Sequence, residues 1–286
     1  MARTRAKTGS LAFQIKANLD GKLRIGESKC FAKAMGTAQE GIYSWDTYRS
    51  YLKHCNYFAE YCRTAHGCRT LEECRPYAEE WVRHRTEQGL SPYTVKLELS
   101  SLGKLYGEPG SNFGPSPSRH RAEITRSRGV AVRDKNFSET KNDRLVQFCR
   151  STGLRRSELK ALTGDKLVKR DNQYYIHVTQ GTKGGRERFA PVIGNVKNVV
   201  ELMRAAGAGN VFQKLSTNAD IHGYRSEYAV AVYRSYARDI TTLPRKEIYY
   251  CRGDLKGVRY DRAAMAVTSQ ALGHNRISVI AGHYLR

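Results

Sequence analysis

The end of the chain places a histidine, His274, ten residues before a tyrosine, Tyr284. A tyrosine hydroxyl can attack phosphorus, but with an ordinary pKa of about 10 it needs neighbouring cations and a base. Three earlier segments supply such groups: TGLRRSEL (152–159), TKGGRERFAPV (182–192) and HGYR (222–225). Together these residues offer the chemistry needed to cut a phosphodiester through a covalent bond to tyrosine.

Such a reaction needs an in-line nucleophile, cations that stabilise the equatorial oxygens, and an acid for the leaving sugar oxygen. The sequence has no carboxylate cluster and no His/Cys cage for a metal, so we expect guanidiniums to supply the charge. Arg155 stands at an expected helix start, and Glu158, three residues on, can hold its guanidinium. An ordinary surface ion pair would give the same pattern.

The other candidate groups are also ambiguous when each is taken alone. Lys183 falls at the tip of an expected β-hairpin, where it could protonate a leaving 5′-oxygen or simply be solvated. His222 and Arg225 are three residues apart and face one side of a helix, which suits two donors to one phosphate. His222 could instead be a capping or core histidine, and Tyr284 is one of 18 tyrosines.

The overall charge indicates a polyanionic partner. The chain has 286 residues, enough for two domains, with a formal net charge of +22 and a pI of about 9.8. Nucleic acid is the expected partner, because Lys and Arg contacts to phosphate dominate such binding. A merely basic surface, as in some secreted proteins, is the alternative.

The sequence has no signal peptide and no apolar run long enough for a membrane helix, so we expect a cytoplasmic, nucleoid-associated bacterial protein with no membrane partner. Seven cysteines without a signal peptide indicate reduced thiols. Four of them cluster around His66, but none forms the close pair typical of zinc sites. We therefore expect free, half-buried thiols and no metal, with a zinc site as the less favoured alternative.

The sequence predicts helices in the first part of the chain, up to about residue 107. Apolar residues recur three and four positions apart from Tyr48 to Cys62, and we expect this helix to begin after Ser44 and to end at Gly67. Ser91 followed by proline opens another helix. The expected organisation is a flexible basic arm over 1–37, which has room for one short helix, and a compact helical domain over 38–107.

The segment 108–129, rich in proline and glycine and then basic, is expected to be a linker. The second domain, 130–286, is expected to hold helices around a two-stranded hairpin formed by 174–179 and 187–192, with further helices at 195–206, 222–238, 260–272 and 277–284. The predicted fold class is mainly α with a small antiparallel β-sheet, in two domains.

The four segments in this order resemble the successive signature boxes of the tyrosine recombinase (phage-type integrase) family. The resemblance covers about 150–286, and the helical segment 38–107 is similar, less specifically, to that family's core-DNA-binding domain. It implies an α+β catalytic domain that works without metal, ATP or another cofactor. The positions that match the family's catalytic residues are Arg155, Lys183, His222, Arg225, His274 and Tyr284, with Glu158 in support.

The resemblance also implies what these positions do. Tyr284 would form a 3′-phosphotyrosyl bond and free a 5′-hydroxyl, with Lys183 as the general acid. The 5′-hydroxyl of a second strand would then attack that bond. Implied partners are double-stranded DNA with inverted-repeat core sites, a tetramer of this chain on two sites, and an accessory DNA-bending or directionality protein.

Two features depart from the family pattern. The spacing from His274 to Tyr284 is ten residues where nine is usual, which makes His283 a neighbour of interest. Only Leu285 and Arg286 follow Tyr284 here, whereas many relatives carry a further helix that docks on the next protomer. We therefore expect the protomers to contact one another in another way.

The leading hypothesis is a site-specific recombinase that integrates and excises a mobile element. A resolvase for chromosome or plasmid dimers, a type IB topoisomerase-like enzyme and a non-catalytic DNA-binding regulator remain alternatives. The expected DNA contacts, mostly to phosphate, are Lys96, Arg119, Arg121, Arg126, Arg128, Arg133, Lys135, Arg186 and Arg188.

Overall fold

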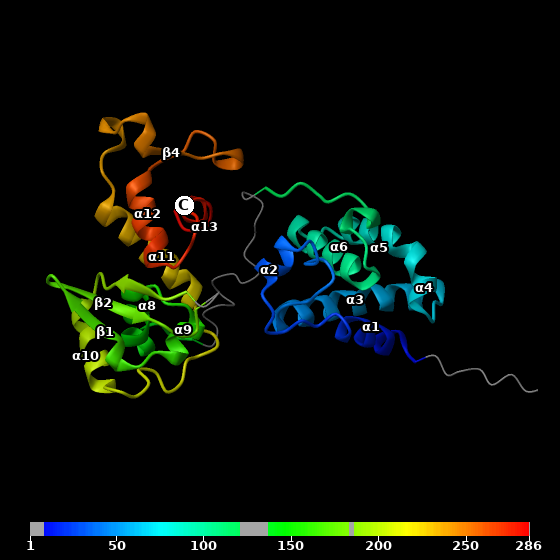
Figure 1. Ribbon diagram of the computed structural model, residues 1–286, viewed down its shortest axis with the longest axis horizontal. Helices are drawn as coiled ribbons and strands as arrows, with labels where there is room; N and C mark the ends of the chain where they lie inside the picture. The colour runs from blue at the N-terminus through cyan, green and yellow to red at the C-terminus, as the bar shows by residue number, and fades with distance from the viewer. Residues whose placement is uncertain (1–8, 121–136, 183–185, 286) are drawn as a thin grey trace, which may run out of the picture. The chain divides into compact units, whose positions relative to one another are not determined.

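The computed structural model describes residues 9–120, 137–182 and 186–285 and divides the chain into two units (Figure 1). The N-terminal unit is Met1–Ile124 and the C-terminal unit is Thr125–Arg286. Most described residues are helical, with small antiparallel sheets in the C-terminal unit, which confirms the predicted fold class. Among the described helices, none has the length and apolar character needed to cross a bilayer.

The regular elements of the N-terminal unit are all helices within its described residues, apart from an isolated bridge between Leu23 and Ile42. Its elements are α1 (Leu11–Asp20), α2 (Lys29–Ala34), α3 (Trp45–His66), α4 (Leu71–Cys74), η1 (Arg75–Tyr77), α5 (Ala78–Glu87), α6 (Pro92–Tyr106) and η2 (Gly110–Phe113). Their apolar faces meet in one core, in which α3 lies against both α1 and α6.

The helix ends lie where the local signals predicted them. The hydroxyl of Ser44 accepts a hydrogen bond from the first turn of α3, and Gly67 closes this helix with a left-handed φ of 68°. Ser91 caps α6 in the same way, and Gly107 ends it at φ 73°. These boundaries confirm the predicted helices, because each depends on a cap within one turn of its helix.

The expected flexible arm over 1–37 is wrong for its described part. Leu11, Ile15 and Leu19 of α1 lie four residues apart and are buried in the core of the unit. The ammonium of Lys22 donates to the backbone carbonyls of Lys104 and Leu105. Residues 9–37 are therefore part of the helical unit, because their apolar stripe has a core to cover.

The linker also begins later than predicted. Phe113 of η2 is fully buried in the N-terminal core, and the guanidinium of Arg75 lies 4.4 Å from its ring centroid. Arg75 also makes a two-pronged ion pair with Glu108, at 2.9 and 2.7 Å. These contacts fix residues 108–113 on the unit, which the proline and glycine content had obscured.

The cysteines are free thiols, six of them buried and Cys30 exposed. Cys62 and Cys74 lie near one another in the core of the N-terminal unit, where their mutual contact, and after it burial, raise the pKa of Cys62. Within the part of the chain that the structure describes, no three His, Cys, Asp or Glu side chains are grouped closely enough to hold a metal.

The C-terminal unit combines helices with two small sheets. Its helices are α8 (Asp143–Thr152), α9 (Arg156–Ala161), α10 (Val196–Ala206), α11 (Ile221–Tyr236), α12 (Arg262–Ala271) and α13 (Ser278–His283). Its strands are β1 (Leu167–Arg170), β2 (Gln173–Val178), β3 (Arg188–Pro191), β4 (Ile248–Tyr250) and β5 (Arg259–Asp261). The short turns are η4 (Thr140–Asn142), η5 (Gly164–Lys166), η6 (Ile240–Thr242), η7 (Arg245–Glu247) and η8 (Gly253–Leu255).

The sheet is larger than the predicted hairpin. The predicted strands appear as β2 and β3, paired antiparallel, and β1 adds a third strand in the order β1-β2-β3. A second hairpin, β4–β5, follows α11 in a segment for which no strand was predicted. Strands of three or four residues carry too little alternation to be read from the sequence.

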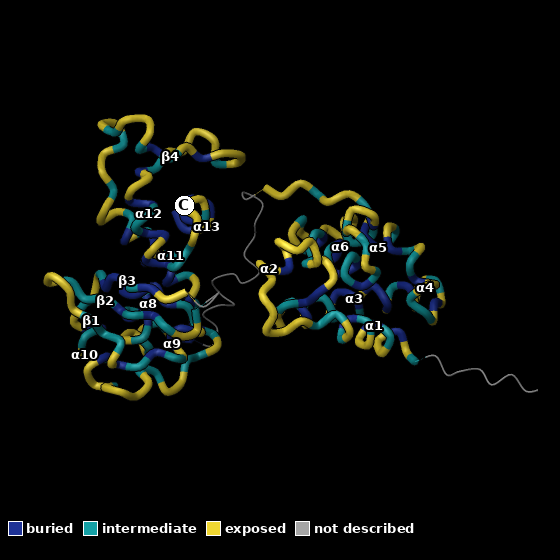
Figure 2. Tube along the Cα trace, in the orientation of Figure 1, coloured by how far each residue is buried: buried dark blue, intermediate teal, exposed yellow. Residues whose placement is uncertain are grey.

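Helix α11 connects the two halves of this unit. Its buried residues extend from Ile221 to Val232 and alternate with more exposed ones along the helix (Figure 2). It contacts α8 on one side and α12 on the other. At the end of α8, Gly153 has φ 59°, and a Cβ there would lie 2.1 Å from the ring of Tyr228 on α11. This glycine lets the α8–α9 turn approach α11 closely.

Candidate active site

The candidate site begins at the N-terminus of α9. Arg155 precedes the helix in extended conformation, and its backbone N–H donates to the Glu158 carboxylate at 2.7 Å. The Arg155 guanidinium donates to the same carboxylate at 2.7 Å and to the Leu272 carbonyl at 3.2 Å. Glu158 is fully buried, so this pair is not the exposed surface pair that remained an alternative.

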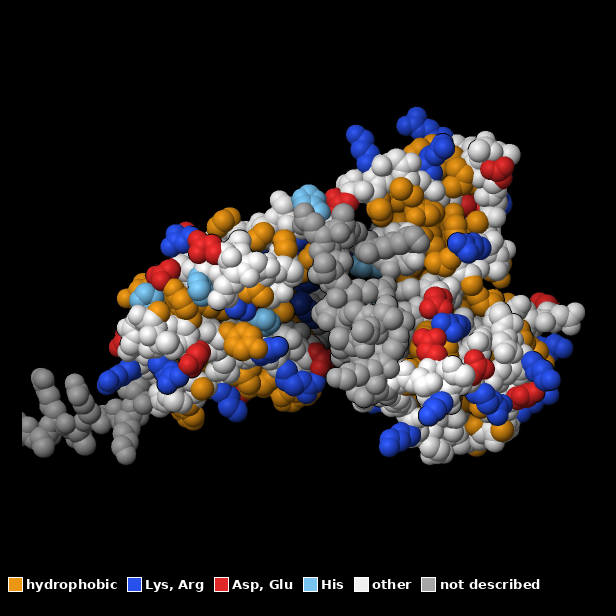
Figure 3. Space-filling model, turned by 180° about the vertical axis from the view of Figure 1, so that it is seen from behind, with side chains coloured by type: hydrophobic (Ala, Val, Ile, Leu, Met, Phe, Trp, Pro, Cys, Tyr) orange, Lys and Arg blue, Asp and Glu red, His pale blue; other side chains and the backbone are white. Residues whose placement is uncertain are grey.

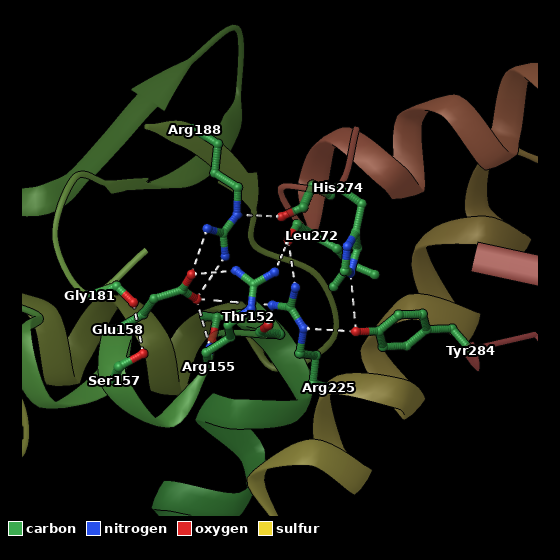
Figure 4. Close-up of polar contacts among 12 residues, drawn as sticks. Thr152, Arg155, Ser157, Glu158, Gly181, Arg188, Arg225, Leu272, His274 and Tyr284 are labelled. Atoms are coloured by element: carbon green, nitrogen blue, oxygen red, sulfur yellow. Dashed lines mark hydrogen bonds and ion pairs between the residues drawn. The ribbon is translucent and has the colours of Figure 1, made fainter. Parts of the chain in front are cut away.

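A second arginine, Arg188 of β3, completes the binding of Glu158. Its two terminal nitrogens donate to the two carboxylate oxygens, each at 2.8 Å, and its Nε donates to the Ala271 carbonyl at 2.9 Å (Figure 4). Burial alone would raise the pKa of Glu158, but the bonds from Arg188 and Arg155 and the nearby charge of Arg225 lower it to about 2. Glu158 is therefore a fixed anion among arginines.

Arg225 lies at the centre of the cluster. It comes from the second turn of α11, is 2% exposed, and donates to the carbonyls of Gly153 and Leu272. Its Nε donates to the Tyr284 hydroxyl at 3.3 Å, and its Nη1 lies 4.0 Å from Glu158. Burial lowers the pKa of Arg225 to about 10, so it stays charged at neutral pH.

Tyr284 directly follows α13 and points its hydroxyl into this cluster (Figure 4). The hydroxyl lies 3.2 Å from Nε2 of His274, and the residue is 7% exposed. His274 follows the glycine that ends α12, and its backbone is tied to Ser269. The nucleophile candidate thus has a guanidinium on one side and an imidazole on the other.

His274 is held neutral. Burial, and after it the charges of Arg225, Arg155 and Arg188, lower the pKa of His274 to about 4. A neutral imidazole has one nitrogen with a free lone pair, so it can accept a proton from a phenol at physiological pH. The arrangement suits a base more than a cationic donor.

His222 and the β2–β3 loop border the cluster. His222, in the first turn of α11, is exposed, with its ring centroid 6.0 Å from that of Tyr284. Gly181 is held against α9 by the Ser157 hydroxyl, which donates to its carbonyl at 2.7 Å. Lys183 lies outside the described residues, two positions beyond this tether.

The structure therefore brings five of the predicted site residues together: Arg155, Arg225, His274 and Tyr284, with Glu158 in support. The site residues lie in the α8–α9 turn and the start of α9, in α11, in the α12–α13 turn and directly after α13, and β3 adds Arg188. Residues as far apart in the sequence as Arg155 and Tyr284 thus form one cationic site with a phenol at its edge.

One solved structure that is similar over the whole fold is the XerH site-specific recombinase bound to its palindromic difH substrate. That structure superposes with a TM-score of 0.53, 15% sequence identity and coverage of 99% of this chain and 95% of the other. The chain has the fold of a tyrosine recombinase.

Two other proteins resemble this chain. A Tn1549 transposon integrase bound to circular intermediate DNA gives a TM-score of 0.47 at 13% identity, covering 90% of this chain and 95% of that one. The shufflon-specific DNA recombinase of Escherichia coli is 21% identical over 173 residues, 56% of this chain. The match spans 43% of that curated relative, less than half its length. No protein-family model matches the chain.

The predicted DNA contact at Arg188 requires correction. Its side chain is buried and its guanidinium is used by Glu158 and Ala271, so it belongs to the interior of the recombinase fold and not to its surface. In β3, Arg188 and Ala190 face the same buried side, and this alternation is the sequence signal that could have located it.

The remaining predicted DNA contacts differ in their surroundings. Arg119 is exposed and lies over the Tyr93 ring at 5.9 Å, Arg186 is exposed and bonds Asn275, and Lys96 is half-buried on α6. Figure 3 shows Lys and Arg side chains spread over the visible face of each unit, with fewer Asp and Glu. Five predicted contacts lie outside the described residues: Arg121, Arg126, Arg128, Arg133 and Lys135.

Proposed function

We propose that this chain is a site-specific DNA recombinase that cuts and rejoins DNA through a 3′-phosphotyrosyl bond at Tyr284. The observation that carries the proposal is the Tyr284 hydroxyl, 3.3 Å from Arg225 and 3.2 Å from His274 within a buried arginine cluster. A phenol that only packed in a core would not need two such polar neighbours around its oxygen. The recombinase fold supports the same activity.

In the first step, the Tyr284 oxygen attacks the scissile phosphorus and passes its proton to the neutral His274 imidazole. The new bond joins this oxygen to phosphorus, and the bond from phosphorus to the 5′-oxygen breaks. The leaving oxygen takes a proton from a general acid, a role we assign to Lys183. The 5′-hydroxyl of a partner strand later attacks the phosphotyrosine in the reverse chemistry.

The charge that develops on the phosphate would be stabilised by donors still free on the arginines. A guanidinium carries five N–H donors. Arg155 uses two of them in the bonds described above, and Arg225 uses three, so donors remain on both. With His222 at the border, these groups can bind the two non-bridging oxygens, and their fixed positions lower the reorganisation that the reaction requires.

We infer that the substrate is double-stranded DNA with inverted-repeat core sites, and that four copies of the chain act on two sites. The role we favour is integration and excision of a mobile element, by a reaction that stores the bond energy in the phosphotyrosine and needs no ATP. The XerH and shufflon relatives are both recombinases by name, which supports strand exchange over simple relaxation of supercoils.

The test uses duplexes made from DNA flanking the coding sequence, each with a nick just beyond the expected cut, so that cleavage traps the covalent product. Incubated in EDTA, the wild-type protein should give a protein–DNA adduct on a denaturing gel. Tyr284→Phe should give none, whereas Tyr249→Phe, a matched change at a half-buried tyrosine of the same unit, should behave as wild type. Adducts in Tyr284→Phe would refute the assignment of the nucleophile.

A second assay separates the alternatives. A recombinase transfers strands between two duplexes, whereas a topoisomerase-like enzyme relaxes supercoils without exchange. Tight binding with no adduct on any nicked substrate would indicate a DNA-binding regulator.

A further inference from the structure

The hairpin β4–β5 has no part in the site described above, yet it concentrates exposed cations. Its strands pair from Ile248 opposite Asp261 to Tyr250 opposite Arg259, and η8 lies in the connecting segment. Six Lys or Arg residues occur between positions 245 and 262, against three Asp or Glu, and all six are exposed. They are Arg245, Lys246, Arg252, Lys256, Arg259 and Arg262.

Two of the three acidic residues of this segment bind an arginine outside it. Glu247 and Asp261 both bind Arg238, which lies outside the hairpin at the end of α11, with distances of 2.7 to 2.8 Å. Asp254 is the one acid between 245 and 262 that Arg238 does not hold. The hairpin therefore presents a surface with excess positive charge.

The base of the hairpin is fixed firmly to the catalytic unit. Two guanidinium nitrogens of Arg238 donate to the buried Asp261 carboxylate, each at 2.8 Å. The Asp261 backbone N–H donates to the Tyr233 hydroxyl at 2.9 Å. Tyr260 donates its hydroxyl to the Leu285 carbonyl at 2.7 Å. Leu285 directly follows Tyr284, so β5 is bonded to the backbone next to the proposed nucleophile.

We propose that the β4–β5 hairpin is a DNA-backbone-binding element of the catalytic unit, a role that rests on the proposed function. A phosphate held at Tyr284 brings the flanking duplex to the strand that is bonded to Leu285. Figure 1 shows β4 and its following turn on the side of the unit where α13 lies. Exposed cations along a two-stranded ribbon match the spaced phosphates of a duplex, and such a ribbon can also enter a major groove.

The test neutralises the three cations of the connecting segment and β5 with Arg252→Gln, Lys256→Gln and Arg259→Gln together. The control neutralises three exposed cations elsewhere in the unit, each to Gln: Lys197 and Arg204 of α10, and Lys214 in the segment that follows α10. Figure 1 shows α10 at the other end of the unit from β4. Both variants lose the same charge, so a difference between them depends on position and not on net charge.

The measured quantity is the slope of log binding constant against log salt concentration, with a duplex that carries the core site. Each phosphate contact contributes about −0.9 to this slope, so the hairpin variant should lose up to about 2.7 in magnitude. The α10 variant should keep a slope within about 0.9 of wild type. Equal slopes for the two variants would overturn the proposal, provided that far-UV circular dichroism shows both folded.

Three outcomes keep this proposal separate from the proposed function. If wild-type protein forms the Tyr284 adduct and both variants bind with equal slopes, the recombinase assignment stands and the hairpin proposal fails. If the hairpin variant keeps the wild-type slope but no longer brings two DNA sites together, the hairpin contacts a second copy of the chain. This result would also overturn the hairpin proposal. A reduced slope in a protein that forms no adduct would support the hairpin alone.

Discussion

Arg188 offers the sharpest test of how the site is built. Replacing it with methionine keeps an unbranched side chain of similar length but removes three hydrogen bonds, two to Glu158 and one to Ala271. Glu158 would keep its bonds to Arg155 and its proximity to Arg225 at 4.0 Å. The cluster would thus lose its most extensive contact while the carboxylate stays buried.

The expected loss of stability follows from this contact list. Removing one partner of a buried ion pair costs about 3–5 kcal/mol. Because two other arginines still neutralise Glu158, and because repulsion among the guanidiniums is relieved, we expect a value near the lower end, about 3 kcal/mol. For a unit of this size that corresponds to a fall of about 6–12 °C in the midpoint of thermal unfolding.

The chain carries a built-in way to locate the effect. Its two tryptophans, Trp45 and Trp81, both lie in the N-terminal unit, so their fluorescence follows that unit alone. Far-UV circular dichroism follows both units. Arg188→Met should lower the dichroism midpoint of the C-terminal unit and leave the tryptophan transition unchanged.

Two further variants complete the experiment. Arg204→Met, at an exposed position of α10, is the matched control and should stay within about 0.5 kcal/mol of wild type. Combining Arg188→Met with Glu158→Gln should cost less than the sum of the single changes, because the carboxylate that needs the charge is gone. A loss below about 1 kcal/mol for Arg188→Met, or strict additivity in the double variant, would refute the reasoning.

Two other outcomes are expected. The pKa of Glu158 is about 2 in the folded protein against about 4.5 in the unfolded chain, so its ionisation contributes about 3 kcal/mol to the free energy of unfolding above pH 4.5. This contribution is lost as the pH falls towards 2. In denaturant titrations, the free energy of unfolding of Glu158→Gln should therefore fall less with decreasing pH than that of the wild type. Leu19→Ala should lower the unfolding free energy of the N-terminal unit by about 2–5 kcal/mol in tryptophan-monitored denaturation, because Leu19 is buried in its core. A change within about 0.5 kcal/mol, typical of a surface site, would show instead that residues 9–37 are an arm outside the core.

The sequence was sufficient wherever a signal is local. Ser44 and Gly67 bound α3 because a hydroxyl cap and a left-handed glycine act within one turn. Arg155, Arg225, His274 and Tyr284 could be chosen because the order of their motifs resembles a family pattern. Their convergence depends on how α11 packs between α8 and α12, which no local pattern encodes.

Other features could not be predicted from the sequence, and each has a physical reason. Only three residues of α1 are buried, and they follow a strongly basic segment, so the charge obscured the face that packs on the core. Strands β1, β4 and β5 have three or four residues each. Arg188 was taken for a surface residue because a buried arginine is explained only by its partner Glu158, which lies 30 positions earlier in the sequence.

The central claim is that Tyr284 forms the bond to DNA, and the most direct measurement is to identify the residue that carries it. The adduct trapped on nicked DNA would be digested with nuclease and protease, and the modified peptide sequenced by mass spectrometry. The account predicts a nucleotide linked through its 3′-phosphate to Tyr284 in the peptide that follows Arg276. A phosphate bond on another tyrosine, such as Tyr250 or Tyr260, or on a serine, would contradict it.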